Sequence, residues 1–252
     1  VVTGIYADSL GKRERVLPLH DDQPTRLRPW VTVRIIICCL ATFLWQLSLS
    51  ETDFDRAVFS LGMIPSVLIG PHFLPTELRV VPSIFTVITS MFLHGGWLHL
   101  LGNMLYLWIF GNNVEDSMGH ARFLAFYLIC GACAALAQAY AAPMSDVPMI
   151  GASGAVAGTL GAYLLLHPRA RILTFVFLGI FWTFIRLPAV VVLGGWIALQ
   201  FVNAIGTQPD TSGVAWLAHI GGFLSGIMLI GVFKYRTVKF FGRSRSGPWG
   251  KS

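Results

Sequence analysis

The stretch VAWLAHIGGFLSGIMLIGVF, residues 214–233, decides what kind of protein this is. It runs for 20 residues without Asp, Glu, Lys or Arg, and about 20 apolar residues in a helix are enough to cross a bilayer. One titratable side chain, His219, lies inside it. Ionisable groups are costly in hydrocarbon, so a group found there is by default a candidate for function.

The composition of the whole chain is that of a membrane protein. Of its 252 residues, 55% are hydrophobic and only 12% are charged, whereas soluble domains carry about 25% charged residues. Six apolar runs are counted as membrane spans. They are Val31–Leu49, about His99–Gly111 (beginning a little earlier, within Ile84–Leu98), Ala121–Ala142, the short Gly151–Leu166, Leu187–Ile205 and Val214–Phe233. The predicted fold is an all-α membrane protein, a bundle of six transmembrane helices with a structured first outside loop.

The basic residues give this bundle an orientation. With six spans, all but two of the 18 Lys and Arg residues lie on the side that holds both termini, and only Arg56 and Arg79 lie opposite. Basic loops mark the cytoplasmic side, so both termini are predicted to be cytoplasmic. A seventh span at the apolar segment 172–185 would break this pattern, so we interpret the segment as interfacial or re-entrant. Because the charges flank the spans, the expected partner is the lipid bilayer and no nucleic acid is expected.

A serine opens the fourth span, in the sequence Gly151-Ala-Ser153-Gly154. A hydroxyl with an imidazole is the minimal set for nucleophilic catalysis, and this topology puts Ser153 and His219 at the same depth. Small residues at i, i+4 spacing also let helices pack closely, which is the simpler explanation of Ser153 taken alone. The candidate packing residues are Gly154, Gly158, Gly161, Gly222 and Gly226.

A third polar group begins the second span. His99 and Asn103 are four residues apart and share a helix face, and both can donate hydrogen bonds to an oxyanion. A polar contact between helices is the alternative. A metal site from His94, His99 and His219 lacks a carboxylate or thiol, so neither metal nor cofactor is predicted. All 12 Asp and Glu residues lie outside the spans or at their ends, which excludes an aspartyl dyad and argues against a proton-driven transporter.

Together the motifs resemble those of the rhomboid intramembrane serine proteases. The shared pattern is His94-x4-His99-x3-Asn103, Gly151-Ala-Ser153-Gly154 and Ala218-His219-x2-Gly222-x3-Gly226, in this order. The resemblance covers about residues 31–235. It implies a serine endopeptidase that hydrolyses peptide bonds in or near the transmembrane segments of protein substrates, with a Ser-His dyad.

The resemblance also implies a role for each polar residue. Ser153 would be the nucleophile, His219 the general base, and His99, Asn103 and the Ser153 backbone N–H the oxyanion hole, while His94 and Glu115 would be structural. Glu115 matches a family position that ties helix ends together. The chain then divides into a basic cytoplasmic N-terminal tail (1–30), a protease domain (31–235) and a basic cytoplasmic C-terminal tail (236–252). Its compact core suits a bacterial plasma membrane, with the active site toward the outside.

Two positions depart from the family pattern. The family often places an aromatic residue one turn after the nucleophile, against the histidine ring, and this chain has Ala157 there. Another group must therefore orient His219. The first outside loop often carries a Trp-Arg pair, but no Trp occurs between Ser50 and Ser90. No catalytic atom is lost, so an active protease is expected. The alternative is a catalytically silent rhomboid-like protein that binds membrane clients.

Overall fold

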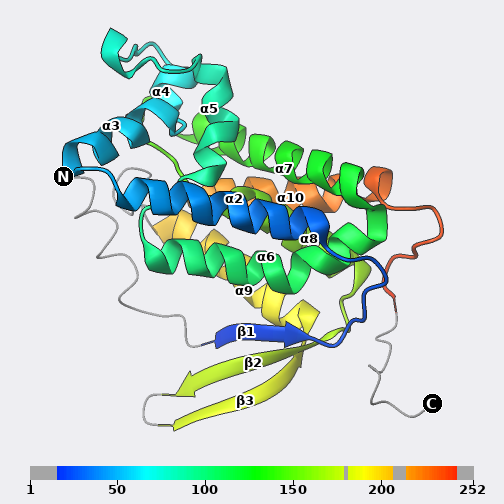
Figure 1. Ribbon diagram of the computed structural model, residues 1–252. Coiled ribbons are helices and arrows are strands. Elements are labelled where there is room, and N and C mark those ends of the chain that lie inside the picture. The colour runs from blue at the N-terminus through cyan, green and yellow to red at the C-terminus, as the bar shows by residue number, and fades with distance from the viewer. Residues whose placement is uncertain (1–15, 179–180, 207–213, 243–252) are drawn as a thin grey trace, which may run out of the picture.

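The computed structural model describes residues 16–178, 181–206 and 214–242, and most of them are helical (Figure 1). Within these residues, helices occupy the positions of all six predicted spans, in the predicted order. They are α2 (Trp30–Leu47), α6 (Trp97–Met118), α7 (His120–Ala141), α8 (Ser153–Leu166), α9 (Ala189–Gly206) and α10 (Trp216–Phe233). The main difference in length is in α6, which continues well beyond Gly111.

Not every one of these helices has the length of a membrane span. In the described part of the chain, α2, α7, α9 and α10 are each long and apolar enough to cross a membrane. α6 meets this standard together with the segment Thr76–Phe92 before it, from which it is bent by 83°. α8 is apolar but has only 14 residues. Length and composition therefore establish four or five candidate spans.

The segment between α2 and α6 folds into several short helices. They are α3 (Glu51–Leu61), α4 (Pro65–Leu68), η1 (Thr76–Leu78), α5 (Ser83–Thr89) and η2 (Ser90–Phe92). Proline is accepted in the first turn of a helix but not in its interior. Accordingly Pro65 begins α4, while Pro75 and Pro82 immediately precede η1 and α5. These prolines thus divide the segment into short helices.

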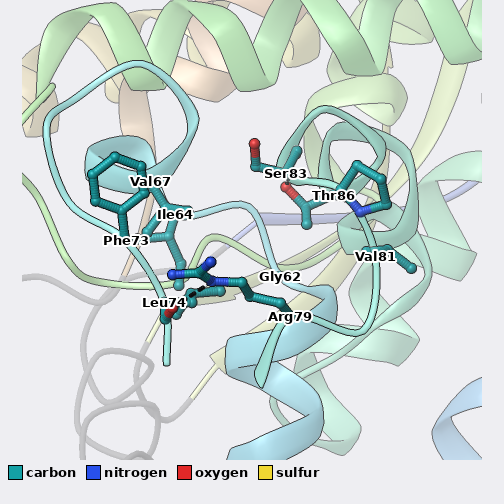
Figure 2. A pocket seen from close by; sticks show the side chains of 10 residues that line it. Gly62, Ile64, Val67, Phe73, Leu74, Arg79, Val81, Ser83 and Thr86 are labelled. Atoms are coloured by element: carbon teal, nitrogen blue, oxygen red, sulfur yellow. Dashed lines mark hydrogen bonds between the residues drawn. The ribbon is translucent and has the colours of Figure 1, made fainter. Parts of the chain in front are cut away.

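Hydrogen bonds to backbone carbonyls hold this segment in place. Arg79 donates from Nε to the Leu74 carbonyl at 2.6 Å, and the Thr89 hydroxyl donates to the Leu61 carbonyl at 2.6 Å. Arg79 also borders a cavity of about 390 Å³ with mostly apolar walls, seen from close by in Figure 2. Arg79 therefore closes a local turn within this segment, in which no tryptophan occurs between Ser50 and Ser90.

The expectation of an all-α fold is wrong at one end of the bundle. Strands β2 (Arg171–Leu178) and β3 (Phe181–Pro188) pair as an antiparallel hairpin, and β1 (Val16–Asp21) pairs antiparallel with β2. The three strands, in the order β1-β2-β3, lie together at the bottom of Figure 1. The hairpin is rich in β-branched and aromatic residues, which favour strands, but a short apolar run alone does not distinguish a strand from a buried helix.

The sheet corrects two further expectations. The segment that was predicted to be interfacial or re-entrant contributes two extended strands, β2 and β3, and its described residues form no helix. Residues 16–21 of the predicted N-terminal tail belong to the folded structure, because β1 is hydrogen-bonded to β2. The outer parts of the two predicted tails, residues 1–15 and 243–252, lie outside the described residues.

A buried carboxylate joins three helices near the sheet. Glu115, in the last turn of α6, accepts hydrogen bonds from the backbone N–H groups of Val31 and Thr32, both at 2.9 Å, and from the Thr32 hydroxyl at 2.7 Å. Nδ1 of His120, the first residue of α7, lies 2.6 Å from the same carboxylate. These bonds tie the start of α2 to the junction of α6 and α7.

Glycines allow α8 and α10 to touch through their backbones. A β-carbon built at Gly222 would lie 2.0 Å from the Gly154 carbonyl oxygen, and one built at Gly226 would lie 1.9 Å from the Gly158 carbonyl oxygen. One built at Gly161 would lie 2.2 Å from the backbone of α10. Gly161, Gly222 and Gly226 therefore lack a side chain where α8 and α10 meet, while a β-carbon at Gly154 or Gly158 would first meet Ala134 or Cys130 of α7. Small residues at such contacts permit close approach.

Candidate active site

The polar residues singled out in the sequence occupy the beginnings of three helices. Ser153 is the first residue of α8, His219 lies in the first turn of α10, and His99 lies in the first turn of α6. Each of these three residues is partly buried and partly exposed. The far end of α8 leads into β2, so the cluster and the sheet lie at opposite ends of α8.

The backbone that leads into Ser153 is held from both sides. Gly151 has a φ of 116°, a conformation that only glycine adopts readily, and its N–H donates to the Ser90 carbonyl at 2.8 Å. Earlier in the same loop, Asp146 accepts hydrogen bonds from the Ser66 hydroxyl at 2.5 Å and from Nδ1 of His72 at 2.7 Å. These two hydrogen bonds lower the pKa of the Asp146 carboxyl because they favour its charged form. The bond from Ser66 has the larger effect and the bond from His72 the smaller one.

His219 is held by a side chain from another helix. Its Nδ1 lies 2.8 Å from Oε1 of Gln200, a buried residue of α9. Because an amide oxygen can only accept, Nδ1 of His219 is the donor and carries the proton. In the neutral ring Nε2 is then unprotonated and can accept a proton.

Two tryptophans flank the same imidazole. The ring centroid of Trp196, one helical turn before Gln200 in α9, lies 5.8 Å from that of His219. The ring of Trp216, at the start of α10, lies 6.1 Å away and nearly perpendicular. The aromatic contact that Ala157 does not provide from α8 comes from these two helices instead.

His99 and Asn103 both face the backbone just before Ser153. A β-carbon built at Gly151 would lie 2.5 Å from Nε2 of His99 and 3.7 Å from Nδ2 of Asn103. Nδ1 of His99 accepts a hydrogen bond from the Gly95 N–H at 3.4 Å, so in the neutral ring Nε2 carries the proton. The two side chains thus present two N–H donors on one side of Gly151.

The Asn103 amide is unusual for a buried polar group. The side chain is 7% exposed, yet Nδ2 has no hydrogen-bond partner among the described residues. Most buried polar atoms have a partner, and an exception needs an explanation. A donor that is buried, unpaired and aimed at the start of α8 is available to a ligand that brings its own acceptor.

His94 is fully buried behind these residues. Its backbone N–H donates to Oε1 of Gln46 at 2.9 Å, and its ring lies 5.2 Å from that of His99. Its Nδ1 lies 3.2 Å from the Phe92 carbonyl. His94 therefore fixes the turn that begins α6 and supports the ring of His99.

The structure does not join every predicted residue. Among the hydrogen bonds of the described residues, none links the Ser153 hydroxyl to His219. The same residues contain no group of three or more His, Cys, Asp and Glu side chains that could hold a metal ion. What the structure brings together is the α8–α10 contact, the His219–Gln200 pair, and His99 and Asn103 facing Gly151.

Comparison with known proteins places this arrangement in a family. The family model of the Rhomboid domain matches residues 82–236, more than half of the chain. This chain belongs to the rhomboid family. The match includes α6 to α10 and every predicted site residue, so the resemblance in the three motifs reflects membership of the family.

Curated rhomboid relatives share about a third of the aligned residues. Rhomboid protein 1, mitochondrial, of Saccharomyces cerevisiae is 33% identical over 180 residues, which are 68% of this chain and 49% of that protein. Rhomboid-like protease 5 of Toxoplasma gondii is 34% identical over 66% of this chain and 18% of its own length. Rhomboid protease GluP of Bacillus subtilis is 32% identical over 66% of this chain and 27% of its own length. The chain thus spans about half or less of these relatives, and two of the three are named as proteases.

Gln200 was not among the site residues predicted from the sequence of this rhomboid. It stands in the run AVVVLGGWIALQFVNAIG of α9, where most of the other residues are apolar. A polar amide inside a membrane helix is the same kind of signal that singled out His219. The contact could not be read from the sequence, because it depends on how α9 is rotated against α10.

Proposed function

We propose that this rhomboid is an intramembrane serine endopeptidase in which Ser153 is the nucleophile and His219 the general base. The observation that carries the proposal is the contact between α8 and α10. Gly154, next to Ser153, touches Gly222, one turn after His219, with no side chain between the two backbones. A nucleophile and a base on two helices in such contact can come within hydrogen-bonding distance of each other. Relatives that are named as proteases support the same activity.

The reaction uses a base with a free nitrogen. Ser153 Oγ attacks the scissile carbonyl carbon while Nε2 of His219 accepts the hydroxyl proton. The C–N bond then breaks, and the imidazolium returns the proton to the departing amine. Water attacks the acyl-enzyme with His219 again as base, which releases the carboxylate product and restores Ser153. The proton on Nδ1 of His219, donated to Gln200, leaves Nε2 free for these steps.

The oxyanion is stabilised by donors that are already in place. Nε2 of His99 and Nδ2 of Asn103 face Gly151, two residues before Ser153. The backbone N–H of Ser153 is one of the first N–H groups of α8, which have no acceptor within the helix. Donors that are pre-oriented and poorly paired in the resting protein stabilise developing charge most effectively. We assign these three groups to the oxyanion hole.

Six membrane crossings are part of the proposal. α2 and α6 run antiparallel at full length, because Glu115 at the end of α6 binds the start of α2 and Gln46 at the end of α2 binds His94 before α6. α6 therefore crosses the membrane if α2 does. β1 and β2 are paired and so lie on one side of the membrane, which requires an even number of crossings between them. With α2, α6 and α7 crossing, α8 must cross as well.

The orientation rests on charge. Of the Lys and Arg residues that the structure describes, all but Arg56 and Arg79 lie toward the end of the bundle that holds the sheet, and such a side is cytoplasmic. The site then opens toward the other side. The substrates are transmembrane proteins with helix-weakening residues near the scissile bond, which enter laterally near α9. The matched relatives include mitochondrial, chloroplast and bacterial proteins, so they do not favour the bacterial plasma membrane that the sequence suggested.

Covalent labelling tests the proposal. The purified protein in detergent is incubated with a fluorophosphonate probe beside Ser153→Ala and His219→Ala variants, and then with a model transmembrane substrate in a bilayer. Labelling and cleavage by the parent alone are expected. Turnover by a pure Ser153→Ala preparation would contradict the role of Ser153. A folded parent that neither labels nor cleaves would favour the silent, client-binding alternative.

A further inference from the structure

The base of the proposed dyad depends on α9 as well as on its own helix. The hydrogen bond from Nδ1 of His219 to Oε1 of Gln200 joins residues 19 positions apart, on different helices. Gln200 is 5% exposed, so water does not compete for this bond. An isolated imidazole in water exchanges its proton between the two nitrogens. Here one fixed acceptor decides which nitrogen holds it.

A second contact fixes which way the Gln200 amide points. Nε2 of Gln200 donates to the Trp196 carbonyl at 3.3 Å, within α9. A carbonyl oxygen can only accept, so the amide nitrogen faces Trp196 and the amide oxygen faces His219. With the amide turned over, two acceptors would face each other in α9 and Nδ1 of His219 would lose its acceptor. The geometry therefore allows one proton arrangement for the neutral ring.

We propose that Gln200 is the positioning residue of the active site: it accepts the Nδ1 proton of His219 and so keeps Nε2 free to act as the base toward Ser153. This inference rests on the proposed function and extends it. It also answers the question raised by Ala157. The orienting group comes from α9, where a serine protease of the triad type uses a carboxylate. An uncharged acceptor suits a site where a buried carboxylate would be costly.

Gln200 can accept the His219 proton only while α9 is packed against α10. α9 has few buried residues among those described, and Val192, Trp196 and Gln200 follow one another at four-residue spacing on one face. Trp196 and Gln200 are the members of that face that contact His219. Ala189 and Leu193 are also fully buried, but most of the other described residues of α9 are exposed. The helix is therefore held by a narrow buried strip that includes Gln200. Any displacement of α9 away from α10 removes the acceptor from His219.

A merely structural hydrogen bond between two helices is the competing explanation, and it predicts a different outcome. If Gln200 only held α9 in place, its loss would lower stability and leave the chemistry of the remaining folded protein unchanged. If Gln200 sets the proton position, its loss lowers the reaction rate in protein that is still folded. The two explanations also differ on whether a substituent that only accepts hydrogen bonds restores the rate.

The first test compares Gln200→Met, which has similar length and no amide acceptor, with Gln200→Glu, which keeps the acceptor. Leu199→Met, at an exposed neighbouring position of α9, is the matched control. The rates of fluorophosphonate labelling and of substrate cleavage are measured at several pH values. A positioned general base contributes about 10²–10⁴-fold to a rate, and Gln200→Met disturbs the base without removing it, so this variant should react roughly 10- to 100-fold more slowly. Gln200→Glu should keep most of the rate, with the low-pH limb moved to higher pH because its carboxylate stabilises the imidazolium.

The outcomes distinguish a failure of the proposed protease activity from a failure of the role proposed for Gln200. If neither the parent nor any variant labels or cleaves, the proposed function fails. If the parent is active and His219→Ala is inactive, but Gln200→Met reacts at the parental rate, only the role of Gln200 is overturned. A slow Gln200→Met that Gln200→Glu does not restore would point to packing alone and would also overturn it.

The second test reads the proton directly and needs no catalysis. In a Ser153→Ala protein with ¹⁵N-labelled histidine, nitrogen NMR distinguishes a protonated Nδ1 from a protonated Nε2. Nδ1 of His219 should be the protonated nitrogen, and Gln200→Met should shift the signal toward the Nε2–H form. A protonated Nε2 in the protein that retains Gln200 would overturn the inference, even if Gln200→Met does not fold.

Discussion

The hydroxyl of Tyr163, in α8, donates a 2.5 Å hydrogen bond to Oδ2 of Asp21, the last residue of β1. The Asn113 amide, in α6, donates to the same oxygen at 2.8 Å. Asp21 is only 3% exposed. Burial raises the pKa of its carboxyl from 3.8 to about 6, and the bond from Tyr163 offsets this only in part. One carboxyl therefore joins the sheet to the bundle in a state that depends on pH.

Asp21 should make the stability of the protein fall as the pH rises from about 4 to about 6. In this window the folded protein binds more protons at Asp21 than the unfolded chain, because its folded pKa is the higher one. The shift corresponds to about 3 kcal/mol that is present below pH 4 and absent above pH 6. Thermal unfolding in detergent across this range measures it.

Asp21→Asn isolates this contribution. The amide oxygen can still accept from Tyr163 and Asn113, but the side chain no longer titrates. The fall in midpoint between pH 4 and 6 should therefore become smaller than in the parent. Asp22→Asn, at the next position, serves as the control for removing one negative charge. An identical pH dependence in the parent and in Asp21→Asn would contradict the prediction.

Glu115→Gln should destabilise the protein even though it changes the shape of the side chain little. The carboxylate accepts from three donors of Val31 and Thr32, and an amide NH₂ would turn a donor toward at least one of them. A buried donor left without an acceptor costs about 1–3 kcal/mol. The unfolding midpoint should fall by several degrees. Thr32→Val, which removes only the hydroxyl, should cost less, and the reverse order would contradict this account.

Gly222→Ala should separate α8 from α10. The new β-carbon would lie 2.0 Å from the Gly154 carbonyl oxygen, which belongs to backbone and cannot rotate away. Overpacking of this kind costs about 1–3 kcal/mol, and it should also abolish fluorophosphonate labelling because it displaces Ser153 relative to His219. Gly194→Ala is the matched control, since a β-carbon there meets nothing within 4 Å. Equal labelling by the two variants would exclude the α8–α10 contact as a requirement for activity.

Asn103→Ala should reduce turnover without a matching loss of stability. Its Nδ2 has no hydrogen-bond partner among the described residues, so removing this donor breaks no hydrogen bond within that part of the chain. Loss of one oxyanion donor typically lowers kcat by about 10²–10³. Substrate cleavage and thermal unfolding are measured on the same preparation. A large fall in midpoint with unchanged turnover would assign Asn103 to packing instead.

Much of the helical part of the fold could be predicted because long apolar runs in the sequence mark the positions of the helices. The long apolar runs from Val31 and from Val214 became α2 and α10 with shifts of a few residues. The strands of segment 171–188 were not predicted, because the prediction relied on the same hydropathy that located the helices. The β-branched and aromatic residues of this segment lie within a run that is apolar except for Thr174 and Thr183 between its flanking arginines, and hydropathy alone does not distinguish a strand from a helix there. Its pairing with β1 depends on residues about 150 positions away.

The residues of the candidate site could be listed from the sequence, but their contacts could not. Spacing along one helix puts His99 and Asn103 on a common face, and the structure has them facing Gly151 together. The partner of His219 lies on a different helix, and no spacing rule reaches across helices. Gln200 therefore became visible only when the rotation of α9 was known.

The pairing of β1 with β2 also fixes when the sheet can form during synthesis of the chain. A ribosome delivers the chain from its N-terminus, so residues 16–21 emerge long before residues 171–178 that complete their ladder. Until then the backbone groups of β1 lack their partners in β2, while α2, α6, α7 and α8 are synthesised. The Asp21 carboxyl likewise waits for Tyr163 of the last of these helices. The sheet is thus completed only after the hairpin has emerged, and insertion machinery that released the chain earlier would leave β1 without its partner strand.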